Sequence, residues 1–196
     1  MQFSDIGYII KAQPHAESSV ILTVLTSQNG KLTGYVKNGL SKKRLGIYQI
    51  GNSVNINAYS RLEESMYSLH IDLLQSNVVA FLGDEKRLSS LSSLCELCNI
   101  CIPEKDNIEG FYNKVDDFFK HIHEDNWLAY YSYFEFYLLD YLGIGLDLSE
   151  CAATGAKNNL KYVSPKSGKA ISEEAGKPYA SRLFAYPQYI VQHNVH

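Results

Sequence analysis

The chain has 196 residues, 45% hydrophobic and 20% charged, so it is large enough to bury a core and is not composed like a disordered segment. No apolar run approaches the ~20 residues that a membrane-spanning helix needs, and the start MQFSDIGYIIKAQ lacks the features of a signal peptide. We therefore expect a soluble cytoplasmic protein.

The net charge of −3 is unevenly distributed along the chain. Residues 1–62 carry seven Lys or Arg against two acids, residues 63–150 carry five against seventeen, and residues 151–196 carry six against two. Lys and Arg on one surface gain affinity for a polyanion by releasing counterions from its phosphates. The basic N-terminal region is therefore the candidate for binding a polyanion.

The first seventy-odd residues alternate apolar and other positions with a period of two, which predicts β-strands. Asn29-Gly30 predicts a tight hairpin, and Pro14-His15 and Gly51-Asn52 predict further turns. About five short strands, with no room for crossover helices, predict a small antiparallel barrel or sandwich. A five-stranded OB-fold barrel fits this count, and an SH3-like barrel is the nearest alternative. The alternating positions are Ile6, Tyr8, Ile10; Val20, Leu22, Val24; Leu32, Gly34, Val36; Val54, Ile56, Ala58; and, less regularly, Met66 and Leu69.

From about Leu74 the apolar residues recur three and four apart, which predicts helices. The first helix contains Leu88 to Ile102 and ends at Pro103, the second covers residues 109–122, and the third covers residues 127–142. Short strands and turns return after Leu148. The expected fold class is α+β, with a barrel domain at residues 1–73 and a helical bundle domain with a small β insertion at residues 74–196.

Two clusters of potential metal ligands lie in the helical region. Cys95, Cys98 and Cys101 are spaced C-x-x-C-x-x-C inside a helical pattern, so they share a face and are predicted to be core side chains rather than a metal site. His121 and His123 diverge on a helix and are predicted to lie at a hydrated helix end. The sequence contains no recognisable catalytic motif, so we expect no enzymatic activity.

Four cations, Lys37, Lys42, Lys43 and Arg44, fall within eight residues between two predicted strands. With cations on the flanking strands they form the predicted nucleic-acid-binding set, because cationic side chains beside aromatic rings suit nucleic acid. Gly34 and Gly39 would let backbone approach a ligand closely, and Tyr35, Tyr48 and Tyr59 could offer stacking faces. A solvated loop with packed tyrosines is the alternative. The flanking cations are Lys11, Lys31 and Arg61.

The segment FSDIGYIIKAQPHAESSVILTVLTSQNGKLTGYVKNGLSKK resembles the opening of the bacterial recombination-mediator family RecO. The later segment GLDLSECAATGAKNNLKYVSPKSGKAISEEAGKPYASRL resembles the zinc-ribbon-like insertion of this family in its alphaproteobacterial form. The resemblance spans nearly the whole chain. It implies an OB-fold, a helical domain and a ribbon-like segment at about residues 149–178.

The resemblance also implies a function in DNA repair and homologous recombination. Proteins of this family bind single- and double-stranded DNA, anneal complementary strands, and cooperate with the partner RecR. They help to load the recombinase RecA on DNA coated by single-strand-binding protein, whose acidic C-terminal tail they contact, which implies association with the nucleoid. The alternative is a protein–protein adaptor with marginal DNA binding, which the acidic residues 63–150 favour.

The sequence departs from the family pattern in two respects. Zinc-binding members carry two C-x-x-C pairs in the ribbon, whereas this region retains only Cys151, so no zinc and no other cofactor is predicted. Family members also usually continue with further helices beyond the point that corresponds to RLFAYPQYI, whereas this sequence ends at His196.

Overall fold

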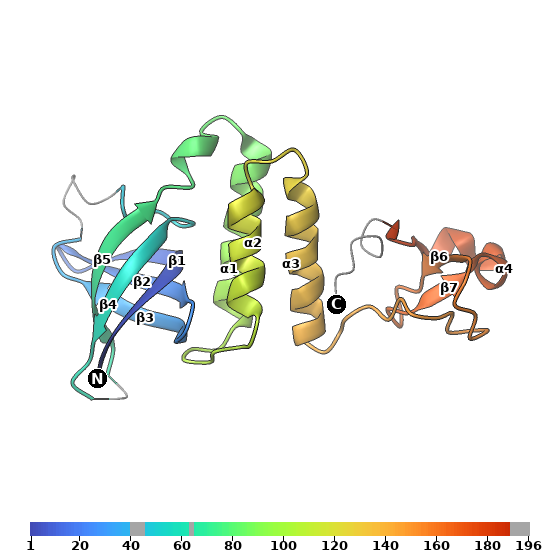
Figure 1. Ribbon diagram of the computed structural model, residues 1–196, viewed down its shortest axis with the longest axis horizontal. Helices are drawn as coiled ribbons and strands as arrows, with labels where there is room; N and C mark the ends of the chain where they lie inside the picture. The colour runs from blue at the N-terminus through green and yellow to red at the C-terminus, as the bar shows by residue number, and fades with distance from the viewer. Residues whose placement is uncertain (40–45, 63–64, 189–196) are drawn as a thin grey trace. The chain divides into compact units, whose positions relative to one another are not determined.

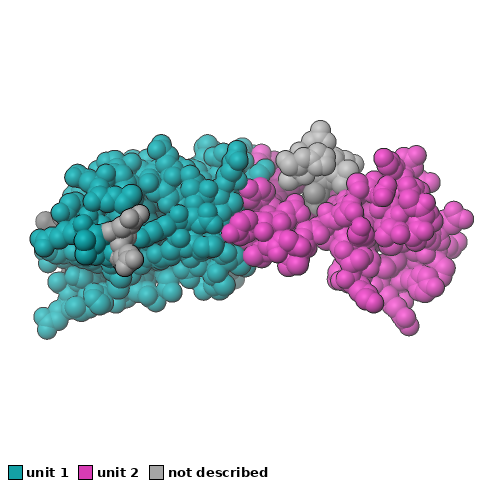
Figure 2. Space-filling model, turned by 90° about the horizontal axis from the view of Figure 1, so that it is seen from below, with its two compact units in different colours: residues 1–124 teal, residues 125–196 magenta. Residues whose placement is uncertain are grey.

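A computed structural model describes residues 1–39, 46–62 and 65–188. The chain divides into two compact units, residues 1–124 and residues 125–196, which Figure 2 colours separately. The predicted domains divide after residue 73, whereas these units divide after residue 124, so the predicted domain boundary stays a prediction. Within the described residues, no helix has the length and apolar character needed to cross a membrane.

The first unit begins with a closed five-stranded barrel (Figure 1). Around the barrel the strands follow the order β1-β2-β3-β5-β4, and every pair is antiparallel except β3 with β5. This confirms the predicted OB-type barrel. The strands are β1 (Gln2–His15), β2 (Ser19–Thr26), β3 (Gly30–Val36), β4 (Ser53–Tyr59) and β5 (Tyr67–Gln75).

The interior of the barrel is filled by the alternating apolar residues that the sequence pattern indicates. Val54, Ile56 and Ala58 on β4 are at most 1% exposed, whereas their neighbours Asn55 and Asn57 are half-buried. The other strands contribute Ile9, Val20, Leu22, Val24, Leu32, Val36, Tyr67, Leu69 and Ile71.

The barrel closes at a short parallel contact in which Gly34 lies opposite Tyr67 and Tyr35 lies opposite Ser68. A Cβ on Gly34 would lie 2.7 Å from the Tyr67 carbonyl oxygen and 2.6 Å from Cγ of Leu69, so only glycine fits here. The prediction that Gly34 lets a ligand approach is therefore wrong, because the close neighbour is β5. Gly39 likewise packs within the unit, with Val20 and Tyr48 as its nearest neighbours.

The first strand departs from the predicted alternation. Ile9 packs in the barrel core, whereas Ile6 of the expected apolar set is 46% exposed; the register shifts only after Ile9, between Ile9 and Lys11. Tyr8 is also buried, but it faces the helices instead of the barrel interior. Alternation correctly puts Ile6 and Ile9 on opposite faces of the strand, but it does not show which face lies toward the barrel interior.

The predicted turn at Pro14-His15 lies two residues too early. Pro14 pairs with Val20 and His15 with Ser19, and the turn comprises the next three residues. β1 pairs with β4 only as far as Tyr8. Beyond Tyr8 it pairs only with β2, so the strand tolerates Pro14, which has no N–H group. The turns predicted at Asn29-Gly30 and Gly51-Asn52 are confirmed.

Two helices, α1 (Glu85–Cys101) and α2 (Phe111–His121), complete the first unit after the short turn η1 (Val79–Phe81). Tyr8 of β1 stacks on Phe119 of α2 with ring centroids 4.2 Å apart, and its hydroxyl donates to Asp116 Oδ1 at 2.8 Å. Cys95 and Cys98 are fully buried, and burial raises the pKa of both thiols. They are core side chains, as predicted.

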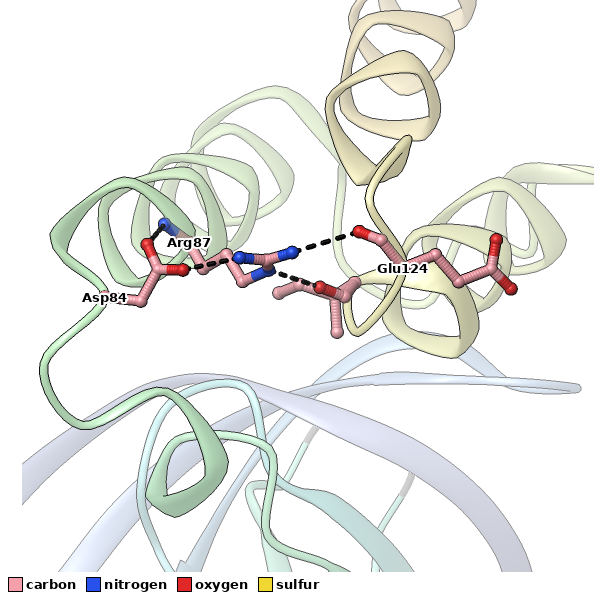
Figure 3. Close-up of polar contacts among 4 residues, drawn as sticks. Asp84, Arg87 and Glu124 are labelled. Carbon is pink, nitrogen blue, oxygen red and sulfur yellow. Dashed lines mark hydrogen bonds and ion pairs between the residues drawn. The ribbon is translucent and has the colours of Figure 1, made fainter.

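Arg87 joins the start of α1 to the end of α2 (Figure 3). Its guanidinium contacts the carboxylate of Asp84, which also accepts from the Arg87 backbone N–H and so caps α1. The other guanidinium nitrogens donate to the carbonyl oxygens of Ile122 at 2.7 Å and Glu124 at 3.0 Å. Carbonyls at a helix end lack intrahelical donors, so the Arg87 side chain supplies donors at the end of α2 while it holds the Asp84 cap of α1.

The second unit contains a helix and a small sheet. Its elements are α3 (Trp127–Tyr141), β6 (Leu160–Val163), β7 (Ala170–Ser172), α4 (Glu173–Gly176), η2 (Lys177–Arg182) and β8 (Phe184–Ala185). The sheet order is β7-β6-β8, with both pairs antiparallel. The predicted third helix and the return to short strands after Leu148 are thus confirmed.

Asp5 organises the β2–β3 turn from the neighbouring strand β1. Its carboxylate accepts hydrogen bonds from Ser27 Oγ, from the backbone N–H groups of Ile6, Gln28 and Asn29, and from Asn29 Nδ2. Burial alone would raise the pKa of Asp5, but these hydrogen bonds outweigh it and hold the pKa below its ordinary value. A buried acceptor with five donors is a sensitive point of the barrel.

We expect Asp5→Asn to lower the free energy of unfolding at pH 7 by about 1–3 kcal/mol, because an amide cannot accept all of these hydrogen bonds. Since the folded pKa is depressed, the contribution of Asp5 is present above its unfolded pKa of about 4 and is lost as the pH falls through the folded pKa. Urea denaturation from pH 7 to pH 3 should show the difference from wild type shrinking. The exposed Asp72→Asn is the control, and an equal loss in both variants would contradict this role.

Candidate nucleic-acid interface on the barrel

A row of outward-facing residues crosses four strands of the barrel. Tyr59 on β4 lies opposite Gln2 on β1 and Ser68 on β5, and Ser68 lies opposite Tyr35 on β3. Tyr59 is 50% exposed, and Tyr35 is partly exposed. The closing contact of β3 with β5 therefore brings two aromatic rings into one row on the surface, as a stacking platform requires.

An open hollow of about 330 Å³ is lined by Gln2, Tyr59 and Ser68 of this row, but not by Tyr35. Among the described residues its lining contains no Asp or Glu and nothing from the helices. Amide, hydroxyl, imidazole and ammonium groups surround the exposed ring of Tyr59, so the hollow offers hydrogen-bond donors with one positive charge. The lining residues are Gln2, Val36, Lys37, Asn57, Ala58, Tyr59, Ser68, Leu69 and His70.

One of the predicted cations, Lys37, lines this hollow. Lys37 follows the end of β3, is exposed, and lines the hollow together with His70. Arg61 is also exposed and follows Tyr59 by two residues. Lys42, Lys43 and Arg44 lie outside the described residues, so their placement stays a prediction.

The other predicted site residues are placed elsewhere. Lys11 lies on β1 opposite Thr23 of β2, is partly exposed, and does not line the hollow. Tyr48 is only 5% exposed and belongs to the barrel core, so it offers no stacking face. Of the three tyrosines considered, Tyr59 and Tyr35 remain available at the surface.

Lys31 has a structural environment that its sequence position does not indicate. It is 7% exposed, and its ammonium group donates to the Asn99 carbonyl oxygen at 2.8 Å. In α1 this carbonyl would accept from the N–H of residue 103, but Pro103 has none. Lys31 therefore replaces the missing donor at the end of α1 and is not an exposed phosphate ligand, so we leave it out of the DNA-binding set.

The histidines of the second cluster face different partners. His121 Nδ1 lies 2.7 Å from the Asp117 carbonyl oxygen, whereas the His123 ring packs on Phe81 with centroids 4.7 Å apart. In the described parts of the chain, no three His, Cys, Asp or Glu side chains are placed to hold a metal ion.

Comparison with known proteins identifies the family. The family model described as recombination protein O, N terminal, matches residues 1–77, and the one described as recombination protein O, C terminal, matches residues 82–196. The chain is 34% identical over 191 residues to the DNA repair protein RecO of Mesorhizobium japonicum, covering 97% of this chain and 75% of the relative. This chain belongs to the RecO family.

Further relatives agree. The DNA repair protein RecO of Rickettsia canadensis is 34% identical over 194 residues, covering 99% of this chain and 80% of the relative. The DNA repair protein RecO of Brucella abortus is 35% identical over 193 residues, covering 97% of this chain and 77% of the relative. Membership of the RecO family places the chain among DNA repair and recombination proteins.

The ribbon-like segment of this RecO chain does not fit a structural zinc ion. Cys151 Sγ accepts from the Ser172 N–H at 3.2 Å and lies 3.4 Å from Ser172 Oγ. Burial opposes ionisation of Cys151, but hydrogen bonds with Ser172 and Thr154 lower its pKa to about 6. One thiol among hydroxyl groups does not supply the four N or S ligands that zinc requires.

The sequence interpretation did not single out Gln2, Asn57 and His70 as site residues. Each occupies an outward position of its strand, and Asn57 stands between the buried Ile56 and Ala58, so strand alternation does mark it as outward-facing. What alternation cannot show is that these three strands are neighbours. Only the pairing of Asn57 with both Ser4 and His70 brings them together.

The assignment of Lys31 leads to a test of stability. We expect Lys31→Met to lower the free energy of unfolding by about 1–3 kcal/mol, because the partly buried Asn99 carbonyl loses its donor. The matched control is Lys37→Met, which removes the same charge from an exposed side chain and should change stability by less than about 0.5 kcal/mol. Urea denaturation measures both, and equal stability of the two variants would refute the structural role of Lys31.

Proposed function

We propose that this RecO-family chain binds single- and double-stranded DNA and anneals complementary strands. The observation that carries the proposal is the barrel hollow, where Lys37 and the exposed ring of Tyr59 line a surface without an acidic residue among those described. Phosphates would contact the cations, and bases would contact the aromatic row. The proposed DNA-binding residues are Lys11, Lys37, Lys42, Lys43, Arg44 and Arg61.

Annealing has a plain electrostatic requirement, which this charge distribution suits. Two strands repel each other until their phosphates are neutralised, and bound cations lower that repulsion. Residues 1–62 contain seven Lys or Arg against two acids; with Lys31 and Asp5 both buried, six cations and one acid remain. The basic region can therefore neutralise phosphates without chemical change to the DNA, and we infer that the chain acts by binding and not as an enzyme.

We further propose that the chain helps RecR to load the recombinase RecA on DNA coated by single-strand-binding protein, within the cytoplasm at the nucleoid. The acidic residues 63–150 support protein contacts in this region, since seventeen acids against five cations repel DNA. The alternative, a repair adaptor with marginal DNA binding of its own, rests on the same acidic region.

The DNA-binding proposal predicts a salt-dependent loss in Lys42/Lys43/Arg44→Ala. Each lost phosphate contact should reduce the slope of log affinity against log salt by about 0.7 for single strands, so the triple variant should lose about 2. Lys37→Gln removes one phosphate contact, so its slope should fall by about 0.7. Fluorescence anisotropy with a labelled oligonucleotide at several salt concentrations measures the slopes.

The matched control for Lys37→Gln is Lys86→Gln, which removes one exposed charge from α1 of the same unit and should leave the slope unchanged. Identical affinity and slope for wild type and the triple variant would refute the role of the basic segment. Strand-annealing rates of the same variants connect binding to function, and they should fall in the same order.

The partner proposal predicts that purified RecR and a peptide with the acidic tail of single-strand-binding protein each bind the chain without DNA. Isothermal titration with each partner, alone and with the triple variant, separates the two functions. Normal partner binding with no DNA affinity in the wild type would favour the adaptor. Absence of binding by both partners would refute this part of the proposal.

A further inference from the structure

A second basic and aromatic surface lies on the second unit, in the segment from η2 to β8. Within eight residues this segment presents two large aromatic side chains and two cations, in the order Lys177, Tyr179, Arg182, Phe184, and all four are exposed. Tyr179 is 59% exposed and Phe184 is 64% exposed. Aromatic side chains of this size are usually packed, so two rings on one short exposed segment indicate a binding surface.

The segment is held in place by the small sheet. β8 pairs with β6, the Tyr186 N–H donates to the Lys161 carbonyl oxygen at 2.9 Å, and the Tyr186 hydroxyl donates to the Leu148 carbonyl oxygen at 3.1 Å. At the other end, α4 packs against the sheet, where a Cβ on Gly176 would meet the Tyr162 ring at 2.3 Å. The exposed rings are therefore presented by a fixed backbone, which lowers the ordering cost of binding a ligand.

The geometry of η2 brings one ring and one charge together. Residues three apart share a side of a 3-10 helix, so Tyr179 and Arg182 face the same direction. Phe184 follows Arg182 by two residues at the start of β8. Cations thus flank Tyr179 on both sides along the segment, and Arg182 precedes Phe184.

Two acidic residues of this unit, Glu173 and Asp147, form ion pairs with lysines outside this surface. Lys161 pairs with Glu173, and Lys169 pairs with Asp147 at 3.4 Å. The pKa of Glu173 is held below its ordinary value, chiefly by Lys161 and to a lesser extent by Lys177. In the described part of this unit, no carboxylate forms an ion pair with Arg182, so its charge is available to a ligand.

We propose that this surface, Lys177, Tyr179, Arg182 and Phe184, is a second site for single-stranded DNA, separate from the barrel. Unpaired bases expose faces that stack on aromatic rings, whereas a duplex hides them and an acidic peptide needs only the cations. The inference rests on the proposed function only in taking DNA as the ligand. Two separate sites would let one chain hold two strands during annealing.

The site is tested by photo-crosslinking the full chain to a single strand that contains 5-iodouracil. We expect crosslinks within residues 177–186, and about tenfold less crosslinking there in Tyr179→Ala/Phe184→Ala, since a stacked base contributes a factor of this order. Tyr179→Trp, which retains an aromatic face, should crosslink like wild type. Tyr179→Leu, which retains apolar area without a π face, should lose the part of this crosslinking that depends on Tyr179.

The charge contribution has a matched pair within the same unit. Arg182→Gln should reduce the salt slope of binding, measured by crosslink yield, by about 0.7, because a phosphate contact is lost. Lys169→Gln removes the same charge from a residue already paired with Asp147 and should leave that slope unchanged. Thermal denaturation confirms that each variant is folded.

Three results would overturn the inference: no crosslink within residues 177–186, a Tyr179→Leu variant equal to wild type, or displacement of DNA by an acidic peptide to which the aromatic variants bind normally. The last result would make the surface a protein-binding site. Repeating the crosslinking in the Lys42/Lys43/Arg44→Ala chain distinguishes the two proposals. If the Lys42/Lys43/Arg44→Ala chain binds DNA as wild type does and still crosslinks at residues 177–186, the barrel site alone is refuted. If the wild-type chain crosslinks at the barrel but not at residues 177–186, the second site alone is refuted.

Discussion

The closing contact between β3 and β5 determines how the surface of the barrel is assembled. It depends on one residue without a side chain, because any Cβ at Gly34 would collide with the Tyr67 carbonyl and with Leu69. Once the two strands meet there, Tyr35 lies in one row with Ser68 and Tyr59, and Lys37 reaches the side of the barrel that carries His70. The candidate nucleic-acid interface is therefore a consequence of barrel closure.

Charged groups in this chain divide between structural and surface roles. Lys31 supplies the donor that Pro103 removes from the end of α1, Arg87 satisfies two carbonyls near the end of α2, and Asp5 holds the β2–β3 turn. These groups have fixed partners inside the first unit, so they are not available to DNA. Exposed cations such as Lys37 and Arg61 can exchange water and counterions for phosphate, so the proposed DNA binding depends on them.

Much of the fold could be predicted from local pattern. Period two placed the five strands, the three-and-four spacing placed α1, α2 and α3, and Pro103 was correctly expected to end α1. The errors arose where a residue responds to a distant neighbour. The bulge between Ile9 and Lys11, the burial of Tyr48 and the close approach at Gly34 all depend on contacts between segments far apart in sequence, and local periodicity contains no information on them.

The sequence by itself determined the order of the elements, the uneven charge along the chain and the membership of the RecO family, because these follow from composition, periodicity and residue identity. Only the tertiary structure decided which of the cations and rings are at the surface. Lys31 and Lys37 are six residues apart and chemically identical, yet one is buried against a helix end and the other lines an open hollow. Strand pairing and helix packing set that difference, since they fix which side chains can still exchange water for a ligand.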